Sequence, residues 1–471
     1  RRPQASAPLC GIGMFCPRAN RYIEKGGDRM LERIASAFWG PFTLLILLGL
    51  GGYLTLQTRF FSIRCLPEAL RQMCRGETRR GGGRPSAWMA MSTALGATMG
   101  TGNIVGVATA MVAGGPGAIL WMQIAALAGM MIKFSEVALA VEYRRLGPGP
   151  MGYLKLVYRS GKAKALPAAF AVCCLSSAVG MGNMTQSNAA SQALSSLSVP
   201  PVCCAVFFGI FTFVATGRGV GGVMRLSAWI VPVITVGYLA LAGAAVWQER
   251  AALPLALRAV GEGAFGLRAA AGGAAGYGVR SAVRYGLSRG IFSNEAGMGS
   301  SPIAHAEAGG KGPVEQGMWG ILEVLIDTSL SCTLTALVLL TAGGGAFWRE
   351  SGLDGAALAT ACFSAALDSR CGPVVSLFIA LFGITSVCGW YAYGRRALEF
   401  LCPHCRVAMG AYRLLYAVGA ALGAVWGSRE IWLLCDFFTG TMLLLNLPGL
   451  IVLAPRVCRM VRTWEERRHR G

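Results

Sequence analysis

The stretch STALGATMGTGNIVG, residues 92–106, holds four glycines, three threonines, a serine and an asparagine inside an apolar segment. The apolar segment, 88–112, is long enough to cross a membrane as a helix. Backbone that is not helical is tolerated at membrane depth only where it lines a cavity or is buried in protein. The stretch therefore predicts a helix that is interrupted at a binding site, and the break is marked by Gly96, Gly100, Gly102 and Gly106.

The composition is that of a polytopic membrane protein, because 54% of the 471 residues are hydrophobic and only 14% are charged. The apolar runs are long, rich in Leu, Ala and Gly, and do not alternate with polar residues, which excludes a membrane β-barrel. We therefore predict an all-α fold with eleven transmembrane helices. The runs lie at 37–58, 88–112, 117–140, 166–192, 199–217, 224–247, 284–305, 316–343, 371–394, 407–426 and 430–454.

The net charge of +21 is explained by membrane topology rather than by nucleic-acid binding, because Arg and Lys gather in alternate loops. Basic segments are predicted to be cytoplasmic, and they are 64–84, 144–164, 218–225, 394–406 and the tail 456–470. The external segments are 193–200, 344–356, 427–429 and, despite four arginines, 248–283. This assignment predicts an external N-terminus and a cytoplasmic C-terminus.

Two features stand outside this plan. Residues 1–33 form a basic leader that lacks the apolar core of a signal peptide, and we predict that it is disordered. Most of the sixteen cysteines lie in apolar helices, where a thiol packs as a small hydrophobic group. The motif Cys402-Pro403-His404-Cys405 has the spacing of a redox dithiol or half a zinc site. Without a second Cys/His pair it is interpreted as a reduced cytoplasmic loop.

The stretch GIFSNEAGMGSSP, residues 290–302, interrupts a second apolar segment about 190 residues after the first break. Each interrupted helix opens a set of five helices, and because five is odd, the second set must cross the membrane inverted relative to the first. Interrupted helices in inverted repeats are typical of secondary transporters with a site at the membrane midplane. The predicted regions are 1–33 (leader), 34–84 (an extra helix and loop), 85–248 (first repeat), 249–283 (external connection), 284–455 (second repeat) and 456–471 (tail).

The first break offers two kinds of ligand. The half-helix that begins near Gly102 directs free N–H groups and its positive dipole end at the cavity, which suits a carboxylate. Carbonyl groups released near Gly96 and Met99 suit a desolvated alkali cation. Close helix packing is the alternative for the glycines, but it leaves the polar residues beside them unexplained. A dinucleotide-binding fingerprint is excluded, because Val105 takes the place of its third glycine and no strand precedes it.

Ionisable residues inside spans need a partner, a cation or a proton, and four carboxylates are of this kind: Glu295, Glu323, Asp327 and Asp436. Asp327 with Thr328 offers hard oxygen ligands to sodium. The alternative for this pair is hydrogen bonding to polar groups of neighbouring helices. For Lys133 and Glu136, near the predicted cytoplasmic edge of their helix, we expect an interfacial salt bridge with the lysine reaching toward water.

Polar side chains on two further helices are candidates for the same cavity. Asn183 and Gln186 share a helix side at three-residue spacing, and they either hold the substrate's polar end or bond a neighbouring helix. The hydroxyls of Thr385 and Ser386 are candidate cation ligands, and Trp390 is a candidate pocket wall. The alternative for Trp390 is a membrane-interface anchor, although it lies several residues before the basic end of its run.

Four segments of the chain resemble the signature segments of the sodium:alanine (alanine or glycine:cation) symporter family, over a match from about residue 34 to 454. They are ALGATMGTGNIVGVATA (94–110), GGPGAILWMQ (114–123), GIFSNEAGMGSSPIAHA (290–306) and IDTSLSCTLTALVLL (326–340). The resemblance implies a leucine-transporter-like fold of five-plus-five inverted repeats in the bacterial inner membrane. It also implies sodium-coupled import of a small neutral amino acid, alanine or glycine, by alternating access, with sodium as coupling ion and no other cofactor.

Other functions remain as alternatives. Proton coupling is kept open by Glu295 and Asp327. A facilitator or channel would need a continuous polar pore. An enzyme is not expected, because the three histidines do not lie beside further metal ligands outside the CPHC loop.

The resemblance also implies roles for individual residues. The substrate carboxylate would meet the backbone N–H groups of Thr101, Gly102 and Asn103, and its amine would meet Gln186 and carbonyls near Ser293. Trp390 would limit the pocket, with Phe292 as the next candidate.

For sodium, the resemblance implies two sites. The first would use the Thr98 carbonyl, the Asn103 side chain and the Asp327/Thr328 region, and the second would use the carbonyls of Gly96 and Met99 with the hydroxyls of Thr385 and Ser386. The chain departs from the family pattern at Arg395 and Arg396, where an acidic residue is usual, so a cytoplasmic gating salt bridge is expected to be altered.

Overall fold

The computed structural model describes residues 37–74, 84–266, 274–310, 312–427 and 429–470, and every regular element among them is a helix. The predicted leader, 1–33, lies outside the described residues. The first set of helices comprises α2 (Pro41–Gln57), α5 (Ala87–Thr98), η1 (Thr101–Asn103), α6 (Val105–Gly114), α7 (Ala118–Glu142), α9 (Leu166–Val179), η3 (Gly180–Met184), α10 (Thr185–Ser195), α11 (Pro201–Ala215), η4 (Thr216–Arg218) and α12 (Gly219–Gln248).

The second set begins with the other predicted break. It comprises α14 (Ala274–Asn294), α15 (Pro302–His305), α16 (Pro313–Val324), η6 (Leu325–Cys332), α17 (Thr333–Thr341), α20 (Cys371–Leu401), α21 (Arg406–Val425) and α22 (Arg429–Arg470). Shorter helices lie between these: α3 (Phe61–Arg64), α4 (Leu66–Cys74), α8 (Pro150–Val157), η2 (Gly161–Ala165), η5 (Arg250–Ala252), α13 (Leu253–Phe265), η7 (Ala342–Gly345), α18 (Phe347–Glu350) and α19 (Gly355–Ala366).

Each of the eleven apolar runs predicted from the sequence falls on helix. Within the described residues, seven helical runs are long and apolar enough to cross a membrane, or up to nine if each of two bent helix pairs forms one span. One of the seven, Pro201–Gln248, contains two predicted spans, α11 and α12. The all-helical membrane class is therefore confirmed, whereas the exact number of eleven crossings stays a prediction.

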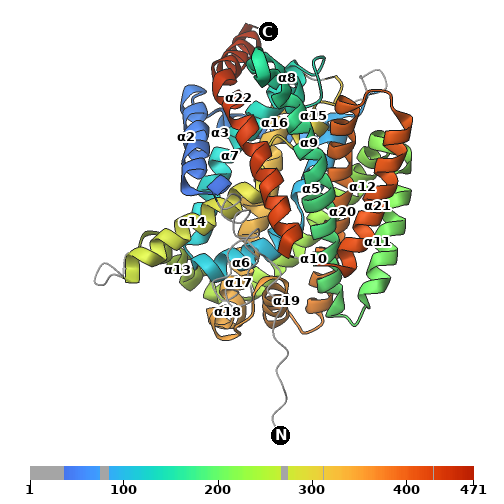
Figure 1. Ribbon diagram of the computed structural model, residues 1–471. Helices are drawn as coiled ribbons and strands as arrows, with labels where there is room; N and C mark the ends of the chain where they lie inside the picture. Colours follow the sequence, from blue (N-terminus) through green and yellow to red (C-terminus); the bar gives the residue numbers. More distant parts are fainter. Residues whose placement is uncertain (1–36, 75–83, 267–273, 311, 428, 471) are drawn as a thin grey trace.

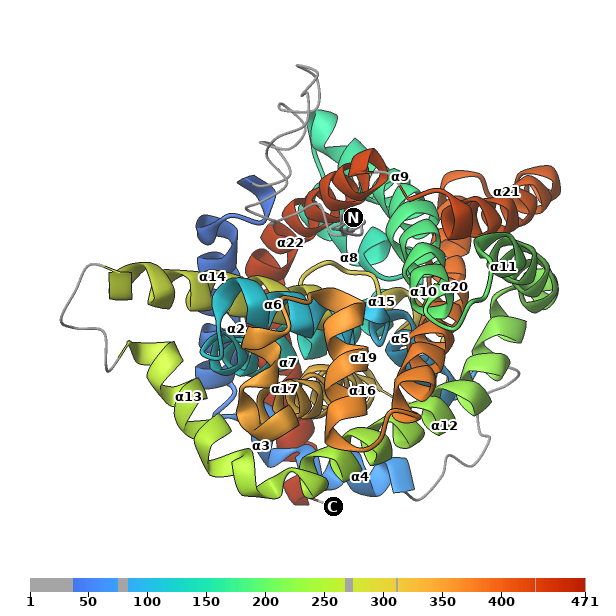
Figure 2. The ribbon, with the colours of Figure 1, turned by 90° about the horizontal axis from the view of Figure 1, so that it is seen from below.

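The helices form a bundle in which segments far apart in sequence lie side by side. Figures 1 and 2 show α11 and α21 together at one edge, with α2 near the opposite edge. The two interrupted helices lie between these edges, where α5 packs against α12 and α20 while α14 and α16 pack against α7. The breaks are thereby enclosed by helices from both halves of the chain.

The two ends of the bundle carry different connections. Figure 1 shows α8 and the C-terminal end of α22 at one end, and α13, α18 and α19 at the other. The first end therefore carries segments predicted to be cytoplasmic, and the second carries segments predicted to be external. Which end faces the cytoplasm stays a prediction.

The basic tail after residue 455 continues α22 as helix as far as Arg470. Val457 and Val461 are buried in the core. Arg468 pairs with Glu68 at 3.1 Å, which ties the tail to α4. Hydrophobic run length underestimated this helix, because its last turns are held by buried side chains and ion pairs rather than by lipid.

Candidate functional site

The first predicted break is present in the structure. The helix α5 ends at Thr98, and the axis turns by 61° before the chain continues through η1 into α6. At the turn, Met99 (φ −70°, ψ 73°) and Gly100 (φ −102°, ψ −160°) have left the helical region. Backbone N–H and C=O groups of this segment are therefore released from the helical pattern at mid-bundle depth.

The glycines at this break have two different environments. A Cβ on Gly100 would lie 2.8 Å from Ser386 Oγ and 2.9 Å from Gln186 Oε1, so Gly100 allows close packing. A Cβ on Gly102 or Gly106 would meet no atom within 4 Å. Open space therefore borders the backbone at the start of α6, where the sequence predicts a carboxylate to approach.

Gln186 reaches this break from α10. Its Oε1 accepts hydrogen bonds from the backbone N–H and from Oγ1 of Thr101, both at 3.2 Å. The amide oxygen thus occupies the Thr101 N–H that was predicted to bind the substrate carboxylate. An amino acid bound through that N–H would have to displace the Gln186 oxygen, while Gly102 stays open.

Asn183 and Gln186 make contacts with different elements. Asn183 Nδ2 donates to the Tyr416 carbonyl of α21 at 2.6 Å. The reason is the π-helix η3 (Gly180–Met184), which changes the angular spacing between the two side chains. The interhelical hydrogen bond, which was the alternative for Asn183, is what the structure contains.

Asp327 lies at the centre of a buried polar cluster that joins three interrupted elements. Its Oδ2 accepts from Ser293 Oγ at 2.8 Å and from Thr328 Oγ1 at 2.7 Å, and its Oδ1 accepts from Asn103 Nδ2 at 2.8 Å. Ser293 comes from the last turn of α14, Asp327 and Thr328 from the π-helix η6, and Asn103 from η1. The structure therefore brings together three residues that the resemblance assigned to the first sodium site, Asn103, Asp327 and Thr328, and one that it assigned to the substrate amine, Ser293.

One oxygen atom in this cluster is left without a partner. Within the described residues, Asn103 Oδ1 is buried and has no hydrogen-bond donor in reach. An unpartnered buried amide oxygen is costly unless a donor or a cation approaches it. Hard oxygens of carboxylate, amide and hydroxyl type are the donors that sodium and other hard cations take. The donor set at Asp327 therefore fits an alkali cation.

A second group of oxygens lies where α5 meets α20. Ser386 Oγ donates to the carbonyl oxygens of Gly96 at 3.1 Å and of Ala97 at 3.2 Å. A Cβ on Gly96 would lie 3.4 Å from Thr385 Cβ, so the absence of a side chain allows α20 to approach. Two candidate ligands that are almost 300 residues apart in sequence are thereby in contact.

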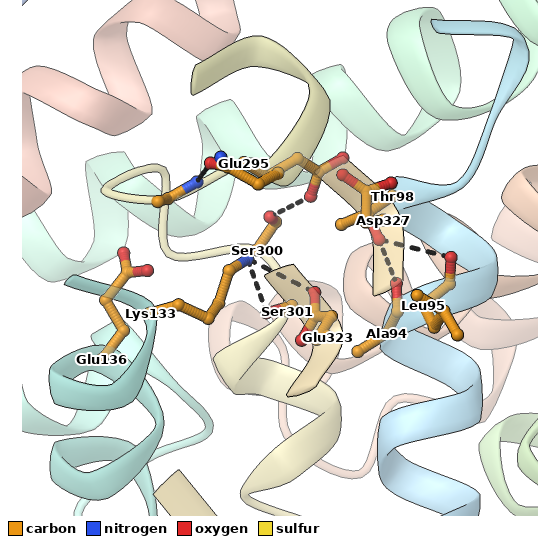
Figure 3. A network of polar contacts seen from close by, with 12 residues as sticks. Ala94, Leu95, Thr98, Lys133, Glu136, Glu295, Ser300, Ser301, Glu323 and Asp327 are labelled. Carbon is orange, nitrogen blue, oxygen red and sulfur yellow. Dashed lines mark hydrogen bonds and ion pairs between the residues drawn. The ribbon is translucent and has the colours of Figure 1, made fainter. Parts of the chain in front are cut away.

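The side chains of the other two predicted cation ligands, Thr98 and Met99, make contacts elsewhere. Thr98 Oγ1 bonds back to the Ala94 and Leu95 carbonyls of its own helix, as Figure 3 shows. The Met99 sulfur accepts from Thr235 Oγ1 at 3.5 Å. Their predicted roles rest on backbone carbonyls, which these side-chain contacts leave unchanged.

The two aromatic candidates occupy different places. Trp390 is buried, so the membrane-anchor alternative is wrong for it. A Cβ on Gly182 would fall 2.0 Å from Trp390 Cγ, so the indole packs directly on the π-helix η3. Phe292 instead contacts Trp39 (ring centroids 5.9 Å apart) and the Arg289 guanidinium. Phe292 therefore lies toward the segment before α2, whereas its neighbour Ser293 faces Asp327.

A network of buried charges lies beside the second break (Figure 3). Here α14 ends at Asn294, and positive φ angles at Glu295, Gly297 and Gly299 lead to α15, so the second predicted interruption is also present. Ser300 donates to the Glu295 carboxylate. The loop between α14 and α15 is thus tied to itself by a buried carboxylate.

Lys133 and Glu136 are fully buried, so the expected interfacial salt bridge is wrong. Lys133 Nζ donates to Ser301 Oγ at 2.9 Å and pairs with Glu323 at 3.4 Å. Glu136 Oε1 accepts from Asn446 Nδ2 at 2.7 Å, and Figure 3 shows its carboxylate pointing away from the lysine. Lys133 does not reach water, because it is fully buried in a helix against which both α14 and α16 pack.

Glu323 contacts a histidine as well as Lys133. His305 Nε2 lies 3.2 Å from its other oxygen, and Gln316 Nε2 lies 2.8 Å from His305 Nδ1. Sequence reasoning did not predict this pairing of Lys133, Ser301, His305 and Glu323. The signal that could have found it was the presence of a lysine and a glutamate in two separate apolar runs, where each needs a partner.

The departure at Arg395 and Arg396 is compensated within the structure. Arg396 pairs with Glu307, which follows α15, and with Glu399 one turn further along α20. Arg395 pairs with the same Glu399 at 2.9 Å. A salt bridge between α20 and the chain after the second break therefore exists, with the arginine on α20.

Comparison with known proteins adds three findings. The sodium:alanine symporter family matches residues 24–471. A sodium/alanine symporter, AgcS, of Methanococcus maripaludis is 35% identical over 93% of this chain and 97% of its own, and a probable sodium/glutamine symporter, GlnT, of Bacillus subtilis is 33% identical over 94% and 93%. The crystal structure of MhsT in complex with L-phenylalanine is 14% identical, with a TM-score of 0.52 over 82% of this chain and 99% of MhsT, and it shares the fold.

Proposed function

Because this chain belongs to the sodium:alanine symporter family, we propose that it is a sodium-coupled symporter that imports a small neutral amino acid, alanine or glycine. It is a multi-pass membrane protein and a cation-coupled amino-acid transporter, not an enzyme. The proposal concerns the coupling ion, the substrate and the residues that bind them.

One observation carries the proposal: Asn103 donates through Nδ2 to the Asp327 carboxylate and keeps an unpartnered buried amide oxygen, Oδ1, next to open backbone at Gly102. Asn103 directly follows Gly102 in the chain. A cation bound by Asn103 and Asp327 would therefore lie close to the backbone N–H groups that receive the substrate carboxylate. The positive charge of one ligand would then stabilise the negative charge of the other. This proximity supports coupled binding of an ion and an amino acid.

The roles of the residues follow from their contacts. Backbone N–H groups at Gly102 and Asn103, at the start of α6, would bind the carboxylate with help from the helix dipole. Gln186, now bonded to Thr101, would exchange that bond for one to the substrate. Ser293, bonded to Asp327, would present the second break to the substrate amine.

Two regions would bind sodium. The first comprises Asn103, Asp327 and Thr328, and the second comprises the Gly96 carbonyl with Thr385 and Ser386. The second region joins α5 to α20, which belong to different halves of the chain. A cation there would favour conformations in which the two helices remain together, as alternating access around a central site requires.

The preference for a small side chain depends on the wall of the pocket. The open space at Gly102 does not limit the size of the substrate side chain. A bulky residue at the edge of the pocket has to do so, and Trp390, which packs against Gly182, is the candidate. A rigid wall would exclude branched side chains, since each excess methylene costs about 1–3 kcal/mol. This supports alanine or glycine over larger neutral amino acids.

Counterflow of labelled alanine in proteoliposomes tests the proposal. Sodium-loaded vesicles that contain unlabelled alanine should accumulate label transiently, and replacement of sodium by potassium or choline should abolish the accumulation. Equal counterflow in choline would contradict sodium coupling, and an acid-dependent signal without sodium would indicate proton coupling instead. No exchange of alanine or glycine under any ion would contradict the proposed substrate.

A further inference from the structure

A cavity of about 750 Å³ lies where the α11–α12 connection meets the α20–α21 connection. Both connections belong to segments that the sequence predicts to be cytoplasmic and basic. Figure 1 shows α20 and α21 joined at the same end of the molecule as α8. The side chains that matter here are Arg395, Glu399, His404, Arg406 and Arg413.

The cavity has an excess of positive charge. Three arginines line it against one glutamate, and Glu399 is already paired with Arg395 at 2.9 Å and with Arg396 at 2.5 Å. Within the described part of the chain, no carboxylate lies within ion-pair distance of Arg406 or Arg413. Guanidinium groups without a carboxylate partner are the usual ligands of phosphate.

Arg413 is held in place before any ligand arrives. Its Nε and Nη2 donate to the Phe213 carbonyl at 3.1 and 2.8 Å, and its guanidinium lies 3.9 Å from the Phe213 ring centroid. A Cβ on Gly217 would lie 2.8 Å from Arg413 Nη2, so glycine leaves the room that the guanidinium takes. The cavity is thus a built arrangement across α11, η4 and α21.

The CPHC motif forms the rim of this cavity. Pro403, His404 and Cys405 line it, and His404 has a left-handed backbone with φ of +63°. This turn directs the first N–H groups of α21 toward the loop, and the N-cap residue Cys405 provides no side-chain hydrogen bond to them. A metal site is not formed, since the described residues contain no group of three His, Cys, Asp or Glu side chains that could hold an ion.

Apolar side chains that neighbour the cavity-lining segments in sequence are exposed on the bundle surface. Val407 is 82% exposed, and Val214 and Leu414 are also exposed. Val214 comes from α11 and the other two from α21, the two helices that form this edge of the bundle (Figure 2). A ligand that combines a negative head with hydrocarbon tails matches a basic cavity bordered by such a surface.

We propose that this cavity binds the phosphate group of an anionic phospholipid in the leaflet that the α20–α21 connection faces. The site is independent of the substrate and sodium sites. The CPHC segment and Arg406, which have no part in the proposed transport site, would bind this lipid.

Native mass spectrometry of the purified full chain, titrated with phosphatidylglycerol or phosphatidylcholine, tests this site. We expect the wild type to bind phosphatidylglycerol in preference. Each arginine near a membrane surface contributes on the order of 1 kcal/mol to binding of anionic lipid. At 1.4 kcal/mol per tenfold, Arg406→Gln should weaken binding about fivefold, and Arg406→Gln with Arg413→Gln about 25-fold.

Arg159→Gln is the matched control. Arg159 is exposed in another basic segment, does not line the cavity, and loses the same charge. Its affinity for phosphatidylglycerol should equal that of the wild type. Because Arg413 also links α11 to α21, the single variant Arg406→Gln, for which no hydrogen bond to the described chain is found, keeps the test decisive if the double variant misfolds.

Two results would overturn the proposal. The first is unchanged phosphatidylglycerol binding in Arg406→Gln, or an equal loss in Arg159→Gln, since either would make the effect one of general surface charge. The second is binding of inorganic phosphate with the same dependence on Arg406, together with equal affinity for phosphatidylglycerol and phosphatidylcholine. That result would assign the cavity to soluble phosphate rather than to a lipid headgroup.

Discussion

Replacement of Gly102 by alanine should impair the proposed carboxylate site without disturbing the fold. The φ angle of Gly102 is outside the left-handed region, and its Cβ would meet no atom within 4 Å. The substitution should therefore leave the fold intact, and removal of glycine flexibility should stabilise it by about 0.4–1 kcal/mol. The new methyl group would occupy space beside the N–H groups at the start of α6.

The expected loss of affinity follows from the hydrogen bonds that the methyl group would block. A hydrogen bond to a charged group contributes about 1.5–3 kcal/mol, so the loss of one such bond weakens alanine binding roughly 10- to 150-fold. Gly102→Val, with two further methyl groups, should abolish binding. Isothermal titration of alanine in the presence of sodium measures this, and a thermal unfolding scan of the same sample reports the fold.

Two other glycines provide controls for this experiment. Gly243→Ala in α12 also meets no atom within 4 Å but lies away from the breaks, so it should bind alanine normally. Gly100→Ala should instead lower the unfolding temperature, because its Cβ would lie 2.8 Å from Ser386 Oγ. Normal alanine affinity in Gly102→Ala would refute the reasoning and place the carboxylate elsewhere.

Three further predictions concern the ion, the pocket wall and the buried network. Thr385→Ala with Ser386→Ala should raise the sodium concentration for half-maximal uptake, since two oxygen ligands are lost; an unchanged sodium curve would remove them from the site. Trp390→Ala should weaken alanine uptake and raise the rank of valine and leucine in competition against labelled alanine; an unchanged rank order would leave Trp390 with a packing role only. Lys133→Met should destabilise the protein by about 3–5 kcal/mol, because Glu323 would remain buried without its lysine. Thermal unfolding measures this, and the additional change Glu323→Gln should restore most of the loss.

The sequence predicted both interruptions, because a dense group of glycines and small polar residues inside an apolar run favours broken helix over continuous helix in a membrane. It also assigned Asn103, Asp327 and Thr328 to a sodium site and Ser293 to the adjacent substrate, and these side chains are in contact through Asp327. This success depended on family resemblance, since spacing along the chain does not report which helices meet. The resemblance assigned Ser386 and the Gly96 carbonyl to one sodium site, and the two are in contact, whereas the sodium site itself stays a prediction.

The errors have local physical causes. For Asn183 the sequence left two alternatives open, because a π-helix changes which residues share a face and no sequence period reveals that change in advance. Lys133 and Glu136 were assigned to the membrane edge because their helix was treated alone. Their burial comes from α14 and α16, which pack on α7 from later in the chain. The cavity of Arg406 and Arg413 was missed for the same reason, since residues of two connections that are far apart in sequence form it.

Gradient-driven uptake tests the central claim most directly. Labelled alanine is supplied to proteoliposomes that contain the full chain, with sodium outside and choline inside. We predict that internal alanine rises above the external concentration and falls back when a sodium ionophore collapses the gradient. Uptake that only reaches equal concentrations, or that accumulates to the same level with choline on both sides, would contradict sodium-coupled symport.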